Sequence, residues 1–277
     1  MRIDAHQHFW KYNPTEYSWI SDSMKILKKD FLPVDLKPEL DKMKFDGSVA
    51  VQARQSIEET RWLLNLAGTY GFIKGVIGWI DLCSKGVESQ LAEFSSNQLL
   101  VGVRHVLHDE PDDKFMLQED FLNGISLLKK FNLVYDLLIF PRHIPYAVEL
   151  VEQFPDQKFV LDHISKPRIK DKIVSPWKEG IEQLAGHQNV FCKLSGMVTE
   201  ASWQDQKRGD FAPYLDVVID SFGPSRLMIG SDWPVCTLAS SYNDIMQIIF
   251  DYISSVNQAE RDLIMGHNAG IIYNLHI

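Results

Sequence analysis

Short apolar segments alternate with amphipathic segments along almost the whole 277-residue chain. The apolar segments show little alternation of polar and apolar residues, which is typical of strands buried on both faces. About eight strands are expected, at residues 2–10, 48–52, 73–81, 100–105, 133–140, 158–163, 190–194 and 226–232. Helices are expected at residues 34–44, 57–70, 87–94, 119–131, 144–153, 177–186, 211–222, 242–254 and 258–265. Strict alternation predicts a parallel sheet, and about eight units predict a closed α/β barrel of the (β/α)8 type, the TIM barrel.

We expect a single domain of residues 1–277, because barrels of this type commonly run to about 250 residues. The chain has no linker rich in Pro, Gly or Ser. A doubly wound open sheet is the competing architecture, but no Gly-rich phosphate-binding turn follows any predicted strand. Residues 11–32 are too long for a plain barrel loop, so we expect this segment to be functional.

Composition excludes several classes of function. The formal net charge of −9 argues against a nucleic-acid surface and against an anionic membrane as partners. The first residues lack an apolar signal core, and no stretch approaches about 18 continuous apolar residues. Cys83, Cys192 and Cys236 are odd in number and widely spaced, which predicts reduced thiols in a cytoplasmic protein. The sequence does not determine the oligomeric state, and a homodimer is one state compatible with it.

Polar side chains collect at the C-terminal ends of the predicted strands, where barrel enzymes have their active sites. Because side chains alternate along a strand, His6 and His8 project to the same side. The other strand ends carry Gln52, Arg54, Asp81, Arg104, His105, Asp136, Asp162, His163, Lys193, Ser195, Ser231 and Asp232. A shared polar pocket explains this distribution, since burying these groups singly would cost stability. We expect Asp136, Asp162 and Ser195, taken individually, to cap helices or face outward.

Residue type suggests roles for these side chains. Asp232 is the candidate general base, because a carboxylate beside histidines can take a proton from water. His6, His8 and His163 could bind a metal, or could polarise a carbonyl by hydrogen bonding. The planar fork of Arg104 suits a carboxylate or an oxyanion that forms in the transition state. A turn position is the alternative for Asp232, as Ser-Asp before Pro is common in turns.

A second group of residues is expected to bind substrate. Trp10 and Trp19 could wall a pocket, although packing inside the 11–32 segment is an equal alternative for both. Trp233 follows the candidate base, and Arg54 and His105 lie near strand ends. For both His105 and His108, a solvated position, or one that supports other site residues from behind, is an interpretation at least as good.

Three motifs resemble the amidohydrolase superfamily, of the amidohydrolase-2 type. They are Asp4-Ala5-His6-Gln7-His8-Phe9-Trp10, Leu161-Asp162-His163 and Gly230-Ser231-Asp232-Trp233-Pro234. Within it, Gly102-Val103-Arg104-His105, Lys193-Leu194-Ser195-Gly196 and Gly266 to Ala269 resemble the branch of sugar-lactone and dicarboxylate-lactone hydrolases. That branch includes L-fuconolactone and L-rhamnonolactone hydrolases. The resemblance covers nearly the whole chain.

This resemblance implies a barrel enzyme that hydrolyses a small-molecule lactone, a deoxy-sugar aldonolactone, with a water that Asp232 activates. His163 and Arg104 would act with Asp232, and the metal ligands would be His6, His8, His163 and Asp232. The branch includes members that work without a metal and members with one zinc ion, and the sequence is compatible with both. A two-metal site is not expected, because no Lys occupies the bridging position that binuclear relatives use.

Three alternatives remain. A 2-pyrone-4,6-dicarboxylate-like lactonase would use several cationic anchors, which Arg54, Arg104, Arg142 and Lys193 could supply. A zinc-dependent decarboxylase or hydratase would use the same barrel with an obligatory metal. A barrel that only binds a small acid is the third, although the set of acid, base and cation groups serves chemistry better than binding alone.

Overall fold

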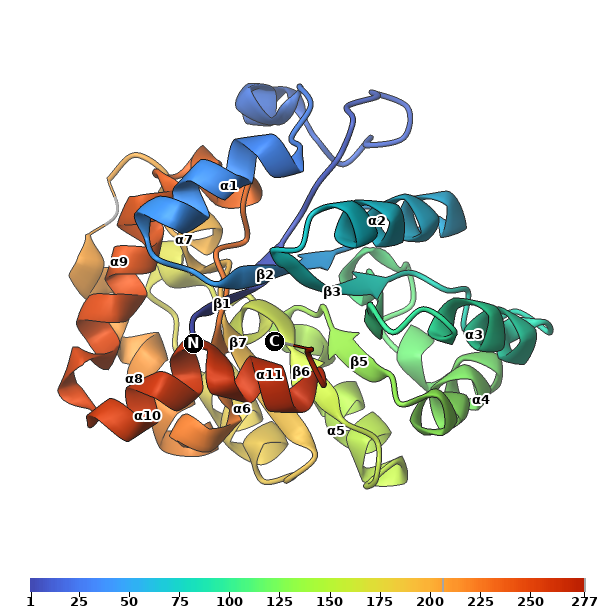
Figure 1. Cartoon of the computed structure of the whole chain (residues 1–277). Coiled ribbons are helices and arrows are strands. Elements are labelled where there is room, and N and C mark those ends of the chain that lie inside the picture. Colours follow the sequence, from blue (N-terminus) through green and yellow to red (C-terminus); the bar gives the residue numbers. More distant parts are fainter. Residues whose placement is uncertain (206, 277) are drawn as a thin grey trace.

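The computed structural model describes residues 1–205 and 207–276, and within them eight parallel strands form one sheet (Figure 1). The strands are β1 (Ile3–Gln7), β2 (Gly47–Val51), β3 (Ile73–Gly78), β4 (Leu100–His105), β5 (Val134–Leu137), β6 (Phe159–Leu161), β7 (Val190–Leu194) and β8 (Leu227–Ile229). They lie in sequence order, each parallel to the next. β8 returns to β1 through a parallel bridge between Gln7 and Trp233. The predicted (β/α)8 barrel is confirmed.

Helices surround the strands in Figure 1. They are α1 (Pro33–Lys42), α2 (Ile57–Thr69), α3 (Val87–Ser95), α4 (Glu119–Leu128), α5 (Ile144–Gln153), α6 (Trp177–Ala185), α7 (Met197–Glu200), α8 (Ala212–Phe222), α9 (Tyr242–Tyr252), α10 (Gln258–Asp262) and α11 (Asn268–Ile272). Each segment that the sequence predicted to be helical overlaps with one of them. None of the helices in the described part of the chain is long and apolar enough to cross a membrane.

Both faces of the strands are apolar, which explains the continuous apolar runs in the sequence. On β2, Val49 and Val51 belong to the cluster inside the barrel, whereas Ala50 packs in the layer between strands and helices. Successive residues therefore pack in two different apolar cores, so the strand has no position for the alternating polar residues of a half-exposed strand.

The last helical segment closes one end of the barrel interior. After α10 the backbone makes a π turn (Leu263–His267) and continues into α11. Ala269, Ile272 and Tyr273 pack in the same cluster as Ile3 and Val49. The interior is thus apolar at this end, and polar groups are left to the opposite end, where the strands terminate.

The long segment after β1 lies against those strand ends. It contains a short 3-10 helix (Asp22–Leu27). The indole of Trp19 donates a hydrogen bond to the carbonyl oxygen of Ala53 at 3.1 Å, and the hydroxyl of Tyr17 donates to Glu59 at 3.1 Å. These bonds fix the segment to the connection between β2 and α2, so it forms part of the wall above the barrel.

Candidate active site

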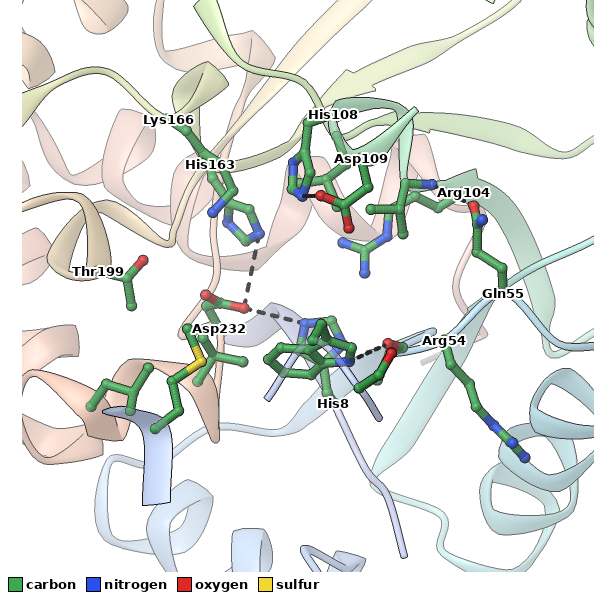
Figure 2. A pocket seen from close by; sticks show the side chains of 18 of the residues that line it. His8, Arg54, Gln55, Arg104, His108, Asp109, His163, Lys166, Thr199 and Asp232 are labelled. Atoms are coloured by element: carbon green, nitrogen blue, oxygen red, sulfur yellow. Dashed lines mark hydrogen bonds and ion pairs between the residues drawn. The ribbon is translucent and has the colours of Figure 1, made fainter. Parts of the chain in front are cut away.

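A cavity of about 510 Å³ opens at the C-terminal ends of the strands (Figure 2). Its polar floor is formed by His8, Arg104, His163 and Asp232, which come from four different strand ends. The structure therefore brings together residues that are far apart in the sequence.

Three imidazole rings converge on one carboxylate oxygen of Asp232. His8 Nε2 lies 3.2 Å from Asp232 Oδ1, and the Nε2 atoms of His6 and His163 each lie 3.8 Å from it. His6 Nε2 and His8 Nε2 are 3.2 Å apart. Figure 2 shows Asp232 between His8 and His163, with the contacts as dashed lines.

The opposite nitrogen of each ring is held by an oxygen atom. His8 Nδ1 lies 2.8 Å from the carbonyl oxygen of Val51, and His163 Nδ1 lies 2.9 Å from the hydroxyl of Ser195. A carbonyl oxygen only accepts, so His8 Nδ1 donates to Val51 and carries a proton.

Burial and neighbouring side chains set the protonation states of His6, His163 and Asp232. Burial lowers the pKa of His6 and of His163 well below the ordinary 6.5, so both rings are neutral at neutral pH. Burial alone would raise the pKa of Asp232. The nearby His163 and the hydrogen bond from His8 outweigh that effect and place the pKa of Asp232 below its ordinary 3.8. The site thus combines the neutral imidazoles of His6 and His163 with the ionised carboxylate of Asp232.

These residues fit one divalent cation. The ligand atoms of His6, His8 and Asp232 all lie within 4.8 Å of one another, and imidazole nitrogens with a carboxylate oxygen are a ligand set that zinc accepts. Arg104 Nη1 also lies 3.2 Å from His6 Nε2. A bound cation and this guanidinium would therefore use the same lone pair of His6.

Beneath the cavity floor lies a layer of buried charges. Asp162 Oδ2 accepts a hydrogen bond from Arg104 Nη1 at 2.9 Å. Asp162 Oδ1 lies 3.2 Å from His6 Nδ1 and 3.1 Å from Lys193 Nζ. Lys193 Nζ also donates to Asp136 at 2.5 Å. Two cations balance two carboxylates, so no charge in this layer is left without an opposite partner.

This layer corrects the expectation for two carboxylates and one hydroxyl. Asp136, Asp162 and Ser195 are buried and point inward. Asp136 and Asp162 each stand two residues after an interior valine, so strand alternation directs them into the barrel. The expectation that they face outward was wrong because it did not pair the two carboxylates with Lys193 and Arg104, or the Ser195 hydroxyl with His163.

Strand β6 ends two residues earlier than predicted. His163, Ile164, Ser165 and Lys166 have φ angles of 54°, 47°, 61° and 49°, so the chain makes a left-handed turn directly after Asp162. Left-handed backbone costs an L-residue roughly 1–2 kcal/mol. The carbonyl oxygen of Ile164 accepts a hydrogen bond from the Trp177 indole at 2.8 Å, which helps to hold this turn.

A glycine permits the close approach of His163 to the end of β7. Gly196 has a φ of +63°, and a Cβ atom at this position would lie 2.4 Å from His163 Nδ1. Any other residue would displace the ring that faces Asp232.

Two of the residues predicted to bind substrate line the cavity, namely Trp19 and Arg54. Arg54 forms an ion pair with Glu16 of the long segment at 2.9 Å. In Figure 2 its guanidinium points away from Asp232, toward the edge of the cavity.

The structure places His105 behind the cavity. Its Nε2 lies 2.6 Å from Glu110, and its Nδ1 accepts a hydrogen bond from the Trp79 indole at 3.3 Å. Both ring nitrogens are therefore engaged by the protein, and we no longer expect His105 to bind substrate.

Trp10 and Trp233 belong to the packing under the long segment. Trp10 is fully buried and its ring contacts those of Trp19 and Phe31. The ring of Trp233 packs against Phe9 and Phe31. Packing, the alternative that the sequence left open for Trp10, is what the structure shows, and Trp233 shares it.

The cavity also has residues that sequence reasoning missed. These are Lys166 and Glu200, which form an ion pair of 3.0 Å in its wall. His108, which the sequence had offered beside His105, lines the cavity as well. Burial, and then the charges of Lys166 and Arg104, lower the pKa of His108 to about 3. The spacing of three residues between His163 and Lys166 was the available signal, but the sequence did not predict a turn at these residues.

The sequence model of a family described as Amidohydrolase matches residues 3–275. An L-fucono-1,5-lactonase of Burkholderia multivorans is 38% identical, over 99% of this chain and 96% of its own. An L-rhamnono-gamma-lactonase of Scheffersomyces stipitis is 25% identical over 71% of this chain and 67% of its own. A crystal structure of an amidohydrolase from Burkholderia multivorans with bound zinc superimposes with a TM-score of 0.97, at 38% identity and 100% coverage of both chains.

Proposed function

The chain belongs to the amidohydrolase family, and from that premise we propose that it hydrolyses a sugar lactone to the open-chain hydroxy acid. The resemblance drawn from the strand-end motifs is thereby confirmed. The substrate class is that of the L-fucono-1,5-lactonase relative, a 6-deoxy-aldonolactone. A small-molecule substrate suits a cavity of about 510 Å³.

The observation that carries the proposal is the convergence of His6, His8 and His163 on the ionised carboxylate of Asp232, beside Arg104. Hydrolysis of a lactone needs a base for water and positive charge at the carbonyl oxygen. Asp232 meets the first need. The Arg104 guanidinium at the cavity floor meets the second.

In the proposed reaction Asp232 takes a proton from a water molecule as the water oxygen bonds to the lactone carbonyl carbon. Arg104 donates a hydrogen bond to the carbonyl oxygen, whose negative charge grows in the transition state. The bond between the carbonyl carbon and the ring oxygen then breaks. The ring oxygen receives the proton from Asp232 and becomes a hydroxyl, so one water is added in total.

A divalent cation held by His6, His8 and Asp232, with His163 beside them, would polarise the carbonyl as a Lewis acid when bound. Zinc is the candidate, because a relative at 38% identity has a structure with bound zinc. The chain's own contribution is the same in either case, because it directs the Nε2 atoms of His6, His8 and His163 toward Asp232.

The test is a pH-indicator assay of purified protein on a panel of aldonolactones and pyrone dicarboxylate. We expect turnover of a 6-deoxy-aldonolactone. Asp232→Asn should lower kcat by about 100- to 10,000-fold, the usual loss when a general base is removed. Circular dichroism should show an unchanged fold. Turnover of pyrone dicarboxylate alone would reject the sugar-lactone assignment.

The metal is tested in the same assay after chelation, with metal content measured by mass spectrometry. We expect bound zinc in the protein as isolated and less of it in His6→Ala and His8→Ala variants. Full activity of protein shown to be free of metal would contradict a required cation while leaving the roles of Asp232 and Arg104 intact.

A further inference from the structure

Two charged residues in the cavity wall have no part in the proposed hydrolysis. Lys166 Nζ lies 3.0 Å from Glu200 Oε1, and the side chains of Lys166 and Glu200 are only 16% and 22% exposed. Both line the cavity that also holds His163 and Asp232. An ion pair that is still in contact with solvent contributes little to stability, so the position of this pair in the cavity suggests a role in binding.

The backbone is strained to place Lys166 in this wall. Residues 163–166 are four consecutive non-glycine residues with positive φ, and each costs roughly 1–2 kcal/mol in that conformation. The turn is closed by a hydrogen bond from the Lys166 amide to the His163 carbonyl at 2.8 Å. Strain that persists in a native fold is commonly found at ligand sites.

The turn directs two side chains into one cavity. Residues three apart in a turn of this tight kind lie one above the other, so Lys166 follows His163 on the same side. Figure 2 shows both side chains coming from the same segment above Asp232, with Thr199 nearby. The strained turn therefore places the Lys166 ammonium group in the same cavity as the His163 imidazole.

The Lys166–Glu200 pair offers both hydrogen-bond donors and hydrogen-bond acceptors to a ligand. An ammonium group only donates, an ionised carboxylate only accepts, and a hydroxyl can do both. Two neighbouring hydroxyls can therefore bind a Lys–Glu pair, one accepting from the ammonium and the other donating to the carboxylate. Another part of the cavity lining is apolar, with Met24, Val235 and Leu238. A ligand with a hydroxylated edge and an apolar substituent fits this division.

We propose that Lys166 and Glu200 bind neighbouring hydroxyl groups of the lactone ring and make the enzyme selective for polyhydroxylated lactones. This inference rests on the proposed lactone hydrolysis and deepens it. The two residues act in binding and not on the reacting carbonyl, so their removal should affect KM more than kcat.

The experiment compares a 6-deoxy-aldono-1,5-lactone with δ-valerolactone, which has the same ring without hydroxyls. In Lys166→Met and in Glu200→Gln we expect the KM for the aldonolactone to rise at least about 10-fold with kcat within about 3-fold. The kcat/KM for δ-valerolactone should change by less than about 3-fold. Lys166→Arg, which keeps the positive charge and the donors, should recover part of the loss.

Lys170→Met is the matched control, because Lys170 is exposed and four residues along the same segment. It should leave both substrates unaffected. Equal losses on both lactones in Lys166→Met, or no change on either, would overturn the inference while wild-type turnover still upheld the proposed function. Absence of wild-type turnover on every lactone would overturn the proposed function itself.

Discussion

Asp232 lies within ion-pair distance of three imidazole rings, and this environment sets the pH range in which it can act. Burial opposes ionisation of Asp232, but the proximity of His163 and the hydrogen bond from His8 lower its pKa below 3.8. A general base works only when deprotonated. A lowered pKa therefore extends its working range toward acid.

We expect kcat/KM for lactone hydrolysis to stay level as the pH falls from about 7 to about 5, because a group with a pKa below 3.8 remains ionised throughout. His6 and His163 do not titrate in this interval either, since burial lowers their pKa well below 6.5. Initial rates in buffers of constant ionic strength, corrected for spontaneous hydrolysis, check this. An acid limb with a midpoint near pH 6 in a correctly folded protein would contradict it.

Most of the floor residues could be predicted from the sequence, because they stand at strand ends and have the right chemistry. His6, His8, Arg104, His163 and Asp232 all meet there. The sequence could not separate Trp19, which lines the cavity, from Trp10, which is buried beside it. That choice depends on how the long segment folds back, and no periodicity in the segment encodes it.

At the scale of elements, the end of β7 and the turn after β6 are fitted to each other. Gly196 has a positive φ of +63° and no side chain, which leaves room for the His163 ring. Ser195, one residue earlier, bonds that ring at 2.9 Å. The end of β7 thus positions the His163 side chain, which belongs to the turn after β6.

Gly196→Ala should lower both stability and activity. The positive φ costs Ala about 1–2 kcal/mol, and the new Cβ would displace His163 from Asp232. We expect kcat to fall by at least about 10-fold, on the general principle that misplacing a catalytic group is costly. Denaturant unfolding and initial rates measure the two effects.

Gly223→Ala is the control for backbone strain alone. Gly223 also has a positive φ, +69°, but nothing lies within 4 Å of its Cβ position. It should lose stability and keep full activity. Equal activity of Gly196→Ala and the wild type would show that the His163 ring does not need the space.

The elements themselves were largely predictable, because the apolar runs mark strands and the amphipathic segments mark helices. The left-handed turn at residues 163–166 was not. It contains no glycine, and local sterics disfavour it at every position. Tertiary contacts help to stabilise it, such as the hydrogen bond from the Trp177 indole to the carbonyl oxygen of Ile164.

At the scale of the whole molecule, the barrel interior is divided into an apolar end and a charged end. Tyr273, just after α11, spans the boundary. Its ring packs in the apolar cluster, and its hydroxyl lies 2.9 and 3.0 Å from the two carboxylate oxygens of Asp136. Asp136 in turn holds Lys193. The C-terminal segment is thereby connected to the charged layer beneath the cavity.

Tyr273→Phe should lower the free energy of unfolding by about 1.5–3 kcal/mol, the usual contribution of a hydrogen bond to a charged group. Activity should change little, because Lys193 still pairs with Asp136. Urea denaturation measures the difference. Tyr252→Phe is the control, since the Tyr252 hydroxyl meets Asp216 at the surface and its loss should cost less than about 1 kcal/mol. Equal losses of unfolding free energy in the two variants would mean that the buried bond contributes no more than the surface bond.

Closure of the sheet between β8 and β1 has a consequence for biosynthesis. During translation His6 and His8 leave the ribosome more than two hundred residues before Asp232. A hydrogen bond of 2.8 Å from the Asp232 amide to the His6 carbonyl oxygen joins the segment after β8 to β1. The two histidines are therefore synthesised long before the carboxylate that they contact, and the site forms only when the eighth strand reaches the first.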